Sequence, residues 1–104
     1  MTDSRIDTLK KMLEKDPDDS FTKYAIGLEY MSQNEPEKAR DIFERLLISD
    51  PLYTATYYQL GKVYEMIEDE RMAKKTYEQG IIETTRQGEF HSRDELEQAV
   101  NDLL

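Results

Sequence analysis

The sequence predicts an all-α fold, a right-handed α-solenoid built from antiparallel helix pairs. Glycine and proline are rare, with four and three residues among 104. Between them lie long stretches rich in Glu, Lys, Arg, Leu and Met, which favour helices, without runs of β-branched residues. The positions that break these stretches recur at a spacing of 34 residues. A fixed period of this length indicates a stack of repeated units.

Five short polar stretches divide the chain into six predicted helices. They are KDPDDS at 15–20, SQNEP at 32–36, SDPLY at 49–53, IEDE at 67–70 and RQGEFHS at 86–92. Proline, glycine, asparagine, aspartate and serine favour turns, so each stretch is expected to end one helix and precede the next. Nothing breaks residues 69–87 before Gly88, so the fifth helix can extend as far as residue 87.

Residues 17–50 align with residues 51–84 without a gap, and eight positions are identical. The identical pairs are Pro17/Pro51, Thr22/Thr56, Tyr24/Tyr58, Gly27/Gly61, Tyr30/Tyr64, Ala39/Ala73, Glu44/Glu78 and Ile48/Ile82. Other pairs are conservative, such as Phe43 and Tyr77. Each unit is therefore predicted to consist of one helix, a short turn and a second helix.

Two short motifs occur in both units. The second unit has Tyr57-x-x-Leu60-Gly61-x-x-Tyr64 and Ala73-x-x-x-Tyr77, and the first has Ile26-Gly27-x-x-Tyr30, Ala39-x-x-x-Phe43 and Pro51. This pattern resembles the tetratricopeptide repeat, and the resemblance covers residues 17–84. The sequence departs from the repeat pattern at Lys23, where an aromatic residue is expected, and at Thr85, where proline is expected.

Residues 1–16 look like the second helix of a repeat whose first helix is missing. Leu9 stands 34 residues before Phe43 and forms an apolar stripe at helical spacing with Ile6 and Leu13. That stripe would be exposed on an isolated helix. We therefore expect this half-repeat to dock on the first full repeat.

Residues 92–104 are predicted to form a terminal helix that covers the exposed end of the second repeat. Ser92 and Glu95 have the spacing of a capping box, which would start the helix at Ser92. Apolar residues follow at helical spacing, at Leu96, Ala99, Val100 and Leu103. Repeat stacks need such helices because each end otherwise presents an unpaired apolar face.

Gly27 and Gly61 are interpreted as points of close approach between the two helices of each repeat. A glycine inside a helix costs about 1 kcal/mol relative to alanine, so a packing reason is expected. Ala39 and Ala73 are the matching small residues on the second helices.

No constellation for catalysis or metal binding stands out. The only histidine, His91, is followed by Ser92 and Asp94, but the predicted capping box already explains the serine. The acidic stretches DPDDS and EDE lack the alternating ligands, glycine and final Glu of a calcium loop. The absence of cysteine excludes disulfides and thiolate metal sites. We expect a non-catalytic protein with no cofactor and no metal.

The net charge of −9 is spread along the chain. An acidic surface repels phosphate backbones, so we expect no nucleic-acid partner. No apolar run approaches the roughly 20 residues that a membrane span needs, so we expect no membrane association. The start, MTDSRIDTLKK, lacks the apolar core of a signal peptide, which predicts a soluble, cytoplasmic protein.

The first helix of the first repeat is apolar on more than the face that meets its partner helix. In proteins with this repeat, the first helices of successive repeats line a concave groove that receives a peptide or partner segment. By resemblance, the groove residues here would be Phe21, Tyr24, Leu28, Met31, Tyr58 and Lys62. The alternative is that neighbouring helices of the same chain bury this face.

The resemblance predicts a protein–protein interaction module, with Tyr24 and Tyr58 as aromatic anchors and Tyr57 assigned to packing. Some relatives clamp a terminal carboxylate with asparagines and lysines, but this face offers one lysine, Lys62, and no asparagine. The partner is therefore expected to be apolar or mildly basic rather than acidic. The alternative function is self-association, in which a second copy covers the apolar face in a homo-dimer or larger oligomer.

Overall fold

The computed structural model describes residues 4–104, and within this range it contains six α-helices and no strand. The helices are α1 (Arg5–Lys15), α2 (Ser20–Ser32), α3 (Pro36–Ser49), α4 (Ala55–Met66), α5 (Glu70–Arg86) and α6 (Phe90–Asp102). This arrangement confirms the predicted all-α fold. The longest helix is α5, with 17 residues.

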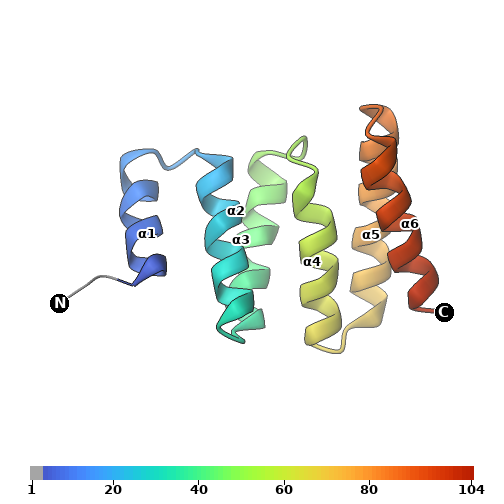
Figure 1. Ribbon diagram of the computed structural model, residues 1–104, viewed down its shortest axis with the longest axis horizontal. Helices are drawn as coiled ribbons and strands as arrows, with labels where there is room; N and C mark the ends of the chain where they lie inside the picture. The colour runs from blue at the N-terminus through green and yellow to red at the C-terminus, as the bar shows by residue number, and fades with distance from the viewer. Residues whose placement is uncertain (1–3) are drawn as a thin grey trace.

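The helices run alternately up and down, and each packs on the next along the chain (Figure 1). Helix α2 also contacts α4, so the first helices of the two repeats lie side by side. In Figure 1, α2 and α6 stand in front of α3 and α5, which gives the stack two layers. The molecule measures 46 × 29 × 20 Å, as expected for a short stack.

The turns after α2, α4 and α5 close in the same way. The residue after each helical cap has a positive φ: Asn34 at 57°, Glu68 at 66° and Gly88 at 74°. The following amide then donates to a carbonyl five residues back, in Glu35–Tyr30 (2.9 Å), Asp69–Tyr64 (2.8 Å) and Glu89–Thr84 (2.8 Å). This is the hydrogen bond of a Schellman motif, which satisfies a carbonyl at the end of a helix.

The predicted close approach at the two glycines is present in both repeats. A Cβ atom added to Gly27 would lie 2.3 Å from Cε1 of Phe43, and one added to Gly61 would lie 2.1 Å from Cε1 of Tyr77. Both aromatic side chains are fully buried. The glycines therefore admit a ring from the second helix, which offsets their low helix propensity.

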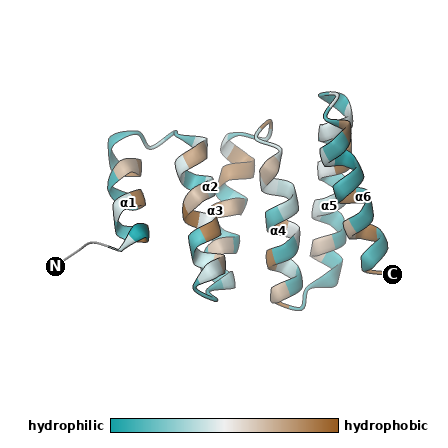
Figure 2. Ribbon diagram, in the orientation of Figure 1, coloured by the Kyte–Doolittle hydropathy of each residue, from teal (hydrophilic) through white to brown (hydrophobic). Residues whose placement is uncertain are grey.

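Two clusters of buried apolar side chains hold the stack together. The larger cluster extends from Ala39 and Phe43 through α4 and α5 to Leu96 and Ala99 of α6. The smaller cluster joins Leu9 of α1 to α2. Apolar and polar residues alternate around the helices, as expected for helices with one buried face (Figure 2).

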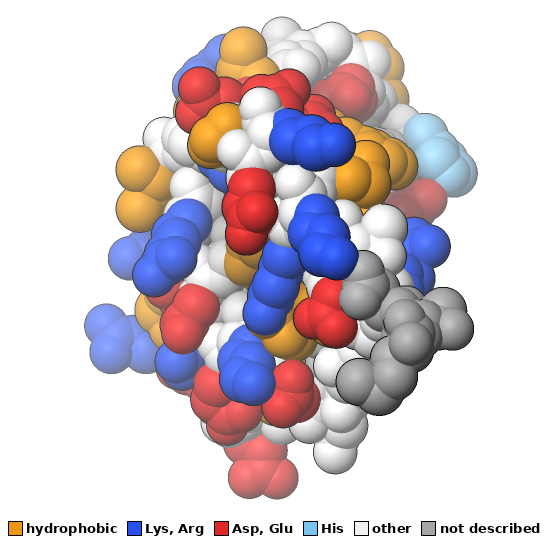
Figure 3. All heavy atoms as spheres, turned by 90° about the vertical axis from the view of Figure 1, so that its left-hand side faces the viewer, with side chains coloured by type: hydrophobic (Ala, Val, Ile, Leu, Met, Phe, Trp, Pro, Cys, Tyr) orange, Lys and Arg blue, Asp and Glu red, His pale blue; other side chains and the backbone are white. Residues whose placement is uncertain are grey.

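Helix α1 lies at the N-terminal end of the stack. Its one fully buried side chain among the described residues is Leu9. Lys10 and Lys15 are exposed on this helix. Lysine and arginine side chains lie among carboxylates and some hydrophobic side chains on this end of the molecule (Figure 3). A mixed, charged face of this kind favours contact with water over contact with another apolar surface.

The prediction of a capping box at Ser92 and Glu95 is wrong. Helix α6 begins at Phe90, and its cap residue is Glu89. The turn needs only the three residues 87–89, because the positive φ of Gly88 reverses the chain there. Ser92 and Glu95 therefore lie within the first turns of α6, and their side chains face a pocket instead.

Helix α6 docks on α5 at a third glycine, which the sequence analysis did not single out. A Cβ added to Gly80 would lie 2.6 Å from Cβ of Tyr57 and 2.9 Å from Cδ1 of Leu96. The hydroxyl of Thr84 donates to the carbonyl of Gly80 at 2.7 Å. Gly80 thus brings α4 and α6 onto the same stretch of α5.

Candidate partner-binding groove

The six residues predicted for the groove come from α2 and α4. Phe21 and Leu28 are 63% and 36% exposed. The other four, Tyr24, Met31, Tyr58 and Lys62, are half-buried. The chain's own helices therefore cover part of this face and leave part of it open.

Tyr24 and Tyr58 line one pocket of about 160 Å³, which we call the Tyr24–Tyr58 pocket. The other lining residues are Thr54, Ala55 and Gln59 at the start of α4, and Ser92, Glu95 and Leu96 of α6. The pocket thus joins the first helix of each repeat to the terminal helix. Phe21, Leu28, Met31 and Lys62 do not line it.

Tyr24 is held between two other aromatic rings. Its ring centroid lies 5.9 Å from that of Phe43 and 5.5 Å from that of Tyr53, both in tilted arrangements. Such arrangements are favourable for aromatic pairs. Burial raises the pKa of the Tyr53 hydroxyl above its usual value, so this ring stays neutral at physiological pH.

Tyr58 packs against Tyr77, with ring centroids 6.2 Å apart. The Lys62 ammonium lies 5.2 Å from the Tyr58 centroid and 5.9 Å from the Tyr77 centroid. The same ammonium is 3.6 Å from the Glu65 carboxylate. Lys62 is therefore engaged with its own chain, and it stiffens Tyr58 through cation–π contact.

Tyr57, the residue before Tyr58, lies in the core instead of at the pocket. Tyr57 is buried, its Cβ lies against Gly80, and its hydroxyl donates to the carbonyl of Pro51 at 3.1 Å. Tyr58 stays half-buried at the pocket wall. The doubled tyrosine thus supplies one ring to the core and one to the pocket.

Glu95 is the only charged residue among those that line the pocket. Its carboxylate is 2.8 Å from Nε2 of His91, one helical turn earlier, and the His91 side chain is 90% exposed. A second hollow of about 240 Å³ beside the pocket shares Thr54 and Ala55 with it and adds Glu89, whose carboxylate accepts a hydrogen bond from the Thr54 hydroxyl at 2.9 Å. This end of the groove therefore carries negatively charged side chains.

Over residues 4–104 there is no group of three or more His, Cys, Asp or Glu side chains placed to hold a metal ion. Within the same part of the chain, no helix is both long and apolar enough to cross a membrane. His91, Ser92 and Asp94 occupy one exposed stretch of α6, where His91 pairs with Glu95.

Sequence reasoning missed Thr54, Ser92 and Glu95 as pocket residues, and Ala55 was not among the six residues that it selected for the groove. Ala55 is small and exposed, so nothing in its side chain marks it as functional. Ser92 and Glu95 carried a capping signal that the actual start of α6 overrides. The 34-residue period also ends before α6, so it could not place them.

A stack of two helix–turn–helix units, preceded by one helix and followed by another, defines a helical-repeat protein. The sequence profile of the tetratricopeptide repeat matches residues 22–51 and 54–81, which is more than half of the chain. The chain therefore belongs to the tetratricopeptide repeat family.

Known proteins resemble this chain over most of its length. A TPR repeat-containing protein of Pseudomonas aeruginosa is 29% identical over 91 residues, which are 88% of this chain and 87% of that protein. The solution structure of a tetratricopeptide repeat domain protein of Salinibacter ruber is 38% identical, with a TM-score of 0.80, and the match covers 85% of this chain and 89% of that one.

A third match concerns the fold alone. The solution structure of a protein from Bordetella parapertussis is 22% identical with a TM-score of 0.86, and the match covers 98% of this chain and 89% of that one.

The tetratricopeptide repeat fold is in general a protein–protein interaction module, and proteins built from it are generally non-catalytic scaffolds.

Proposed function

We propose that this protein binds a peptide or partner segment in the groove formed by α2, α4 and α6, and that it has no catalytic activity of its own. The observation that carries the proposal is the Tyr24–Tyr58 pocket, in which a tyrosine from each repeat meets the terminal helix. Phe21 and Leu28 extend the exposed apolar surface along α2. Preformed pockets lined by aromatic side chains are typical anchor points for a partner.

The proposal is best tested by filling the pocket rather than by removing a tyrosine. Tyr58 packs on Tyr77 and Lys62, so its truncation would also destabilise the fold. Ala55 is exposed and lies at the pocket wall, so Ala55→Arg adds bulk there without opening the core. Gln79→Arg adds the same side chain to an exposed position of α5, on the other layer, and serves as the matched control.

Affinity capture from a lysate of the source organism compares wild type, Ala55→Arg and Gln79→Arg. We expect the same partner with wild type and Gln79→Arg, and its loss with Ala55→Arg at unchanged thermal stability. Equal capture by all three proteins would place the interaction outside the groove and contradict the proposal.

Self-association is the second candidate, and exposed large apolar side chains favour it. They include Phe21, Ile48, Leu52, Ile82 and Phe90, each more than half exposed. Light scattering over a concentration series separates the two candidates. A monomer at every concentration supports the groove proposal, whereas a dimer that Ala55→Arg dissociates supports self-association through the groove.

A further inference from the structure

We infer that the Tyr24–Tyr58 pocket receives an arginine side chain of the partner segment, with Glu95 as its carboxylate partner. This inference rests on the proposed groove function and names the chemistry of the partner. Four features of the pocket carry it: its size, its aromatic walls, its charge and its hydrogen-bond acceptors.

The pocket has room for one long side chain. Its volume of about 160 Å³ corresponds to roughly five waters at about 30 Å³ each. Sites for drug-sized ligands are larger, roughly 300–1,000 Å³. A side chain of an extended segment fits this volume better than a substrate molecule does.

Tyrosine rings on two sides of the pocket suit a planar cation. Tyr24 and Tyr58 both line it, and each packs against a further tyrosine ring that does not line it, Tyr53 and Tyr77 respectively. A guanidinium group stacks on aromatic faces and keeps its charge at any physiological pH. The Tyr58 ring already binds one cation of its own chain, Lys62.

The charge of the lining favours a cation. Glu95 is the single charged lining residue, and Glu89 lies beside the adjoining hollow. No lysine or arginine lines the pocket. The chain carries a net charge of −9, which would attract a basic segment from a distance.

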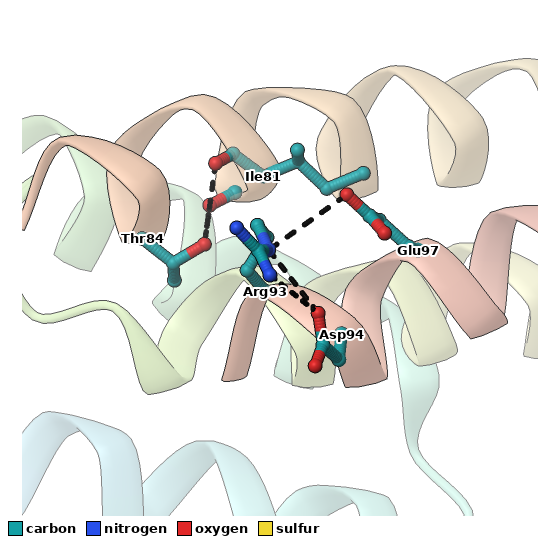
Figure 4. Close-up of polar contacts among 6 residues, drawn as sticks. Ile81, Thr84, Arg93, Asp94 and Glu97 are labelled. Atoms are coloured by element: carbon teal, nitrogen blue, oxygen red, sulfur yellow. Dashed lines mark hydrogen bonds and ion pairs between the residues drawn. The ribbon is translucent and has the colours of Figure 1, made fainter. Parts of the chain in front are cut away.

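The basic residues on α6 and Lys62 do not line the pocket. Arg93 lies along α6 between Asp94, at 2.9 Å, and Glu97, at 3.9 Å (Figure 4). Lys62 pairs with Glu65. His91 contacts Glu95 at 2.8 Å, but His91 does not line the pocket, and its side chain is 90% exposed.

Arginine fits the polar part of the lining better than lysine. The pocket offers oxygen acceptors from Thr54, Gln59 and Ser92 in addition to the Glu95 carboxylate. A guanidinium presents five donors in one plane, whereas an ammonium is a more strongly hydrated point charge. Arginine can also form two parallel charge-assisted hydrogen bonds to one carboxylate, which a lysine ammonium does not.

The test uses three synthetic pentapeptides, acetyl-Ala-Leu-Xaa-Leu-Ala-amide, with arginine, methionine or glutamate at the central position. Each is titrated into isotope-labelled full-length protein, and the amide signals of the pocket residues are followed by NMR. We expect the arginine peptide to bind about tenfold more tightly than the methionine peptide, and the glutamate peptide to bind most weakly.

Two variants test whether Glu95 is the residue that pairs with the arginine side chain. Glu95→Gln should reduce the affinity for the arginine peptide by about tenfold and leave that for the methionine peptide unchanged. Glu97→Gln is the matched control, because Glu97 lies two residues further along α6 with nearly the same side-chain exposure, 53% against 54%, and does not line the pocket.

The outcomes separate this inference from the groove proposal. Equal affinity for the arginine and methionine peptides, or equal effects of Glu95→Gln and Glu97→Gln, would overturn the arginine assignment while the groove stands. Peptide binding that leaves the pocket signals unchanged, or no binding of any peptide at millimolar concentration, would count against the groove itself and so against both.

Discussion

The two repeats share one packing core and differ in the side chains around it. In each, a glycine of the first helix lies against an aromatic ring of the second, Gly27 on Phe43 and Gly61 on Tyr77. These contacts are common to both units because the backbone approach leaves no room for a Cβ. At other positions the two repeats carry different side chains, and two of these differences each involve a pair of positions.

The first pair of differing positions explains why the first repeat departs from the family pattern at Lys23. The second repeat has Tyr57 and Gly80 where the first has Lys23 and Leu46, at the same spacing of 34 residues. Tyr57 packs directly on Gly80, whereas Leu46 is fully buried and Lys23 reaches Ser49 at 3.3 Å. We infer that Leu46 fills the volume in the first repeat that a ring fills in the second.

A second pair exchanges an apolar contact for a polar one. Met31 and Phe43 of the first repeat correspond to Glu65 and Tyr77 of the second. The Tyr77 hydroxyl donates a hydrogen bond to the Glu65 carboxylate. Burial and this hydrogen bond raise the pKa of Tyr77 far above its usual value. The second repeat therefore buries a tyrosine hydroxyl at this position, whereas the first repeat has the phenylalanine Phe43 there.

The largest expected effect tests the shared core. Gly61→Leu should destabilise the protein by about 3 kcal/mol or more, because its first added carbon would already meet the Tyr77 ring. Gly27→Leu should have a similar effect through Phe43. Urea unfolding measures both, and a loss below about 0.5 kcal/mol for either variant would contradict the observed approach.

The second prediction tests the exchange between Tyr57 and Gly80. Gly80→Ala should cost about 1–3 kcal/mol, because the new Cβ would lie 2.6 Å from Cβ of Tyr57. The same change in a Tyr57→Gly background, which lacks the clashing Cβ, should cost at least about 1 kcal/mol less. A double-mutant cycle by urea unfolding gives the coupling, and strictly additive losses would show that the two positions are independent.

The third prediction concerns alkaline pH. The folded-state pKa values of Tyr57, Tyr64 and Tyr77 are raised mainly by burial, so the folded state keeps protons that the unfolded state releases above about pH 10. Stability should be fully present below about pH 10 and fall above it, by up to about 1.4 kcal/mol per pH unit for each tyrosine that is ionised in the unfolded state and still protonated in the folded state.

Tyr77→Phe isolates one of these groups, since it removes a titrating hydroxyl and keeps the ring. The slope of unfolding free energy against pH between 10 and 11 should become shallower by up to about 1.4 kcal/mol per unit. An unchanged slope would mean that Tyr77 ionises equally in the folded and unfolded states.

The smallest expected effect compares two equivalent threonines. The Thr22 hydroxyl donates to the Asp19 carboxylate, whereas the Thr56 hydroxyl is buried and has no hydrogen-bond partner among the described residues. Thr22→Val should cost about 1 kcal/mol, and Thr56→Val should be neutral or slightly stabilising. Thermal unfolding of the two variants decides this, and equal losses would contradict the difference between the repeats.

Much of the fold follows from the period of the sequence. The glycine and aromatic positions recur in both repeats, and six helices follow from the spacing of the breaks. The start of α6 could not be predicted in this way, because the positive φ of Gly88 lets a three-residue turn, residues 87–89, replace the longer connection seen before α4. Ser92 and Glu95 were consequently assigned to a cap, although they line the pocket.

The candidate site was predicted only in part for a related physical reason. Tyr24 and Tyr58 could be chosen because both repeats keep them on the same helical face. Ala55 and Glu95 become pocket residues only through the docking of α6, which depends on Gly80 and Leu96. Contacts between the last repeat and its terminal helix lie outside the 34-residue pattern.

The most direct test of the groove is a photo-crosslinking experiment with the captured partner. Benzoylphenylalanine is placed at the position of Phe21, an exposed aromatic residue of the predicted groove on α2, and in a second protein at the position of Gln79, on the exposed surface of α5. A groove that holds the partner segment predicts a crosslink from position 21 and none from position 79. A crosslink from position 79 alone would contradict it.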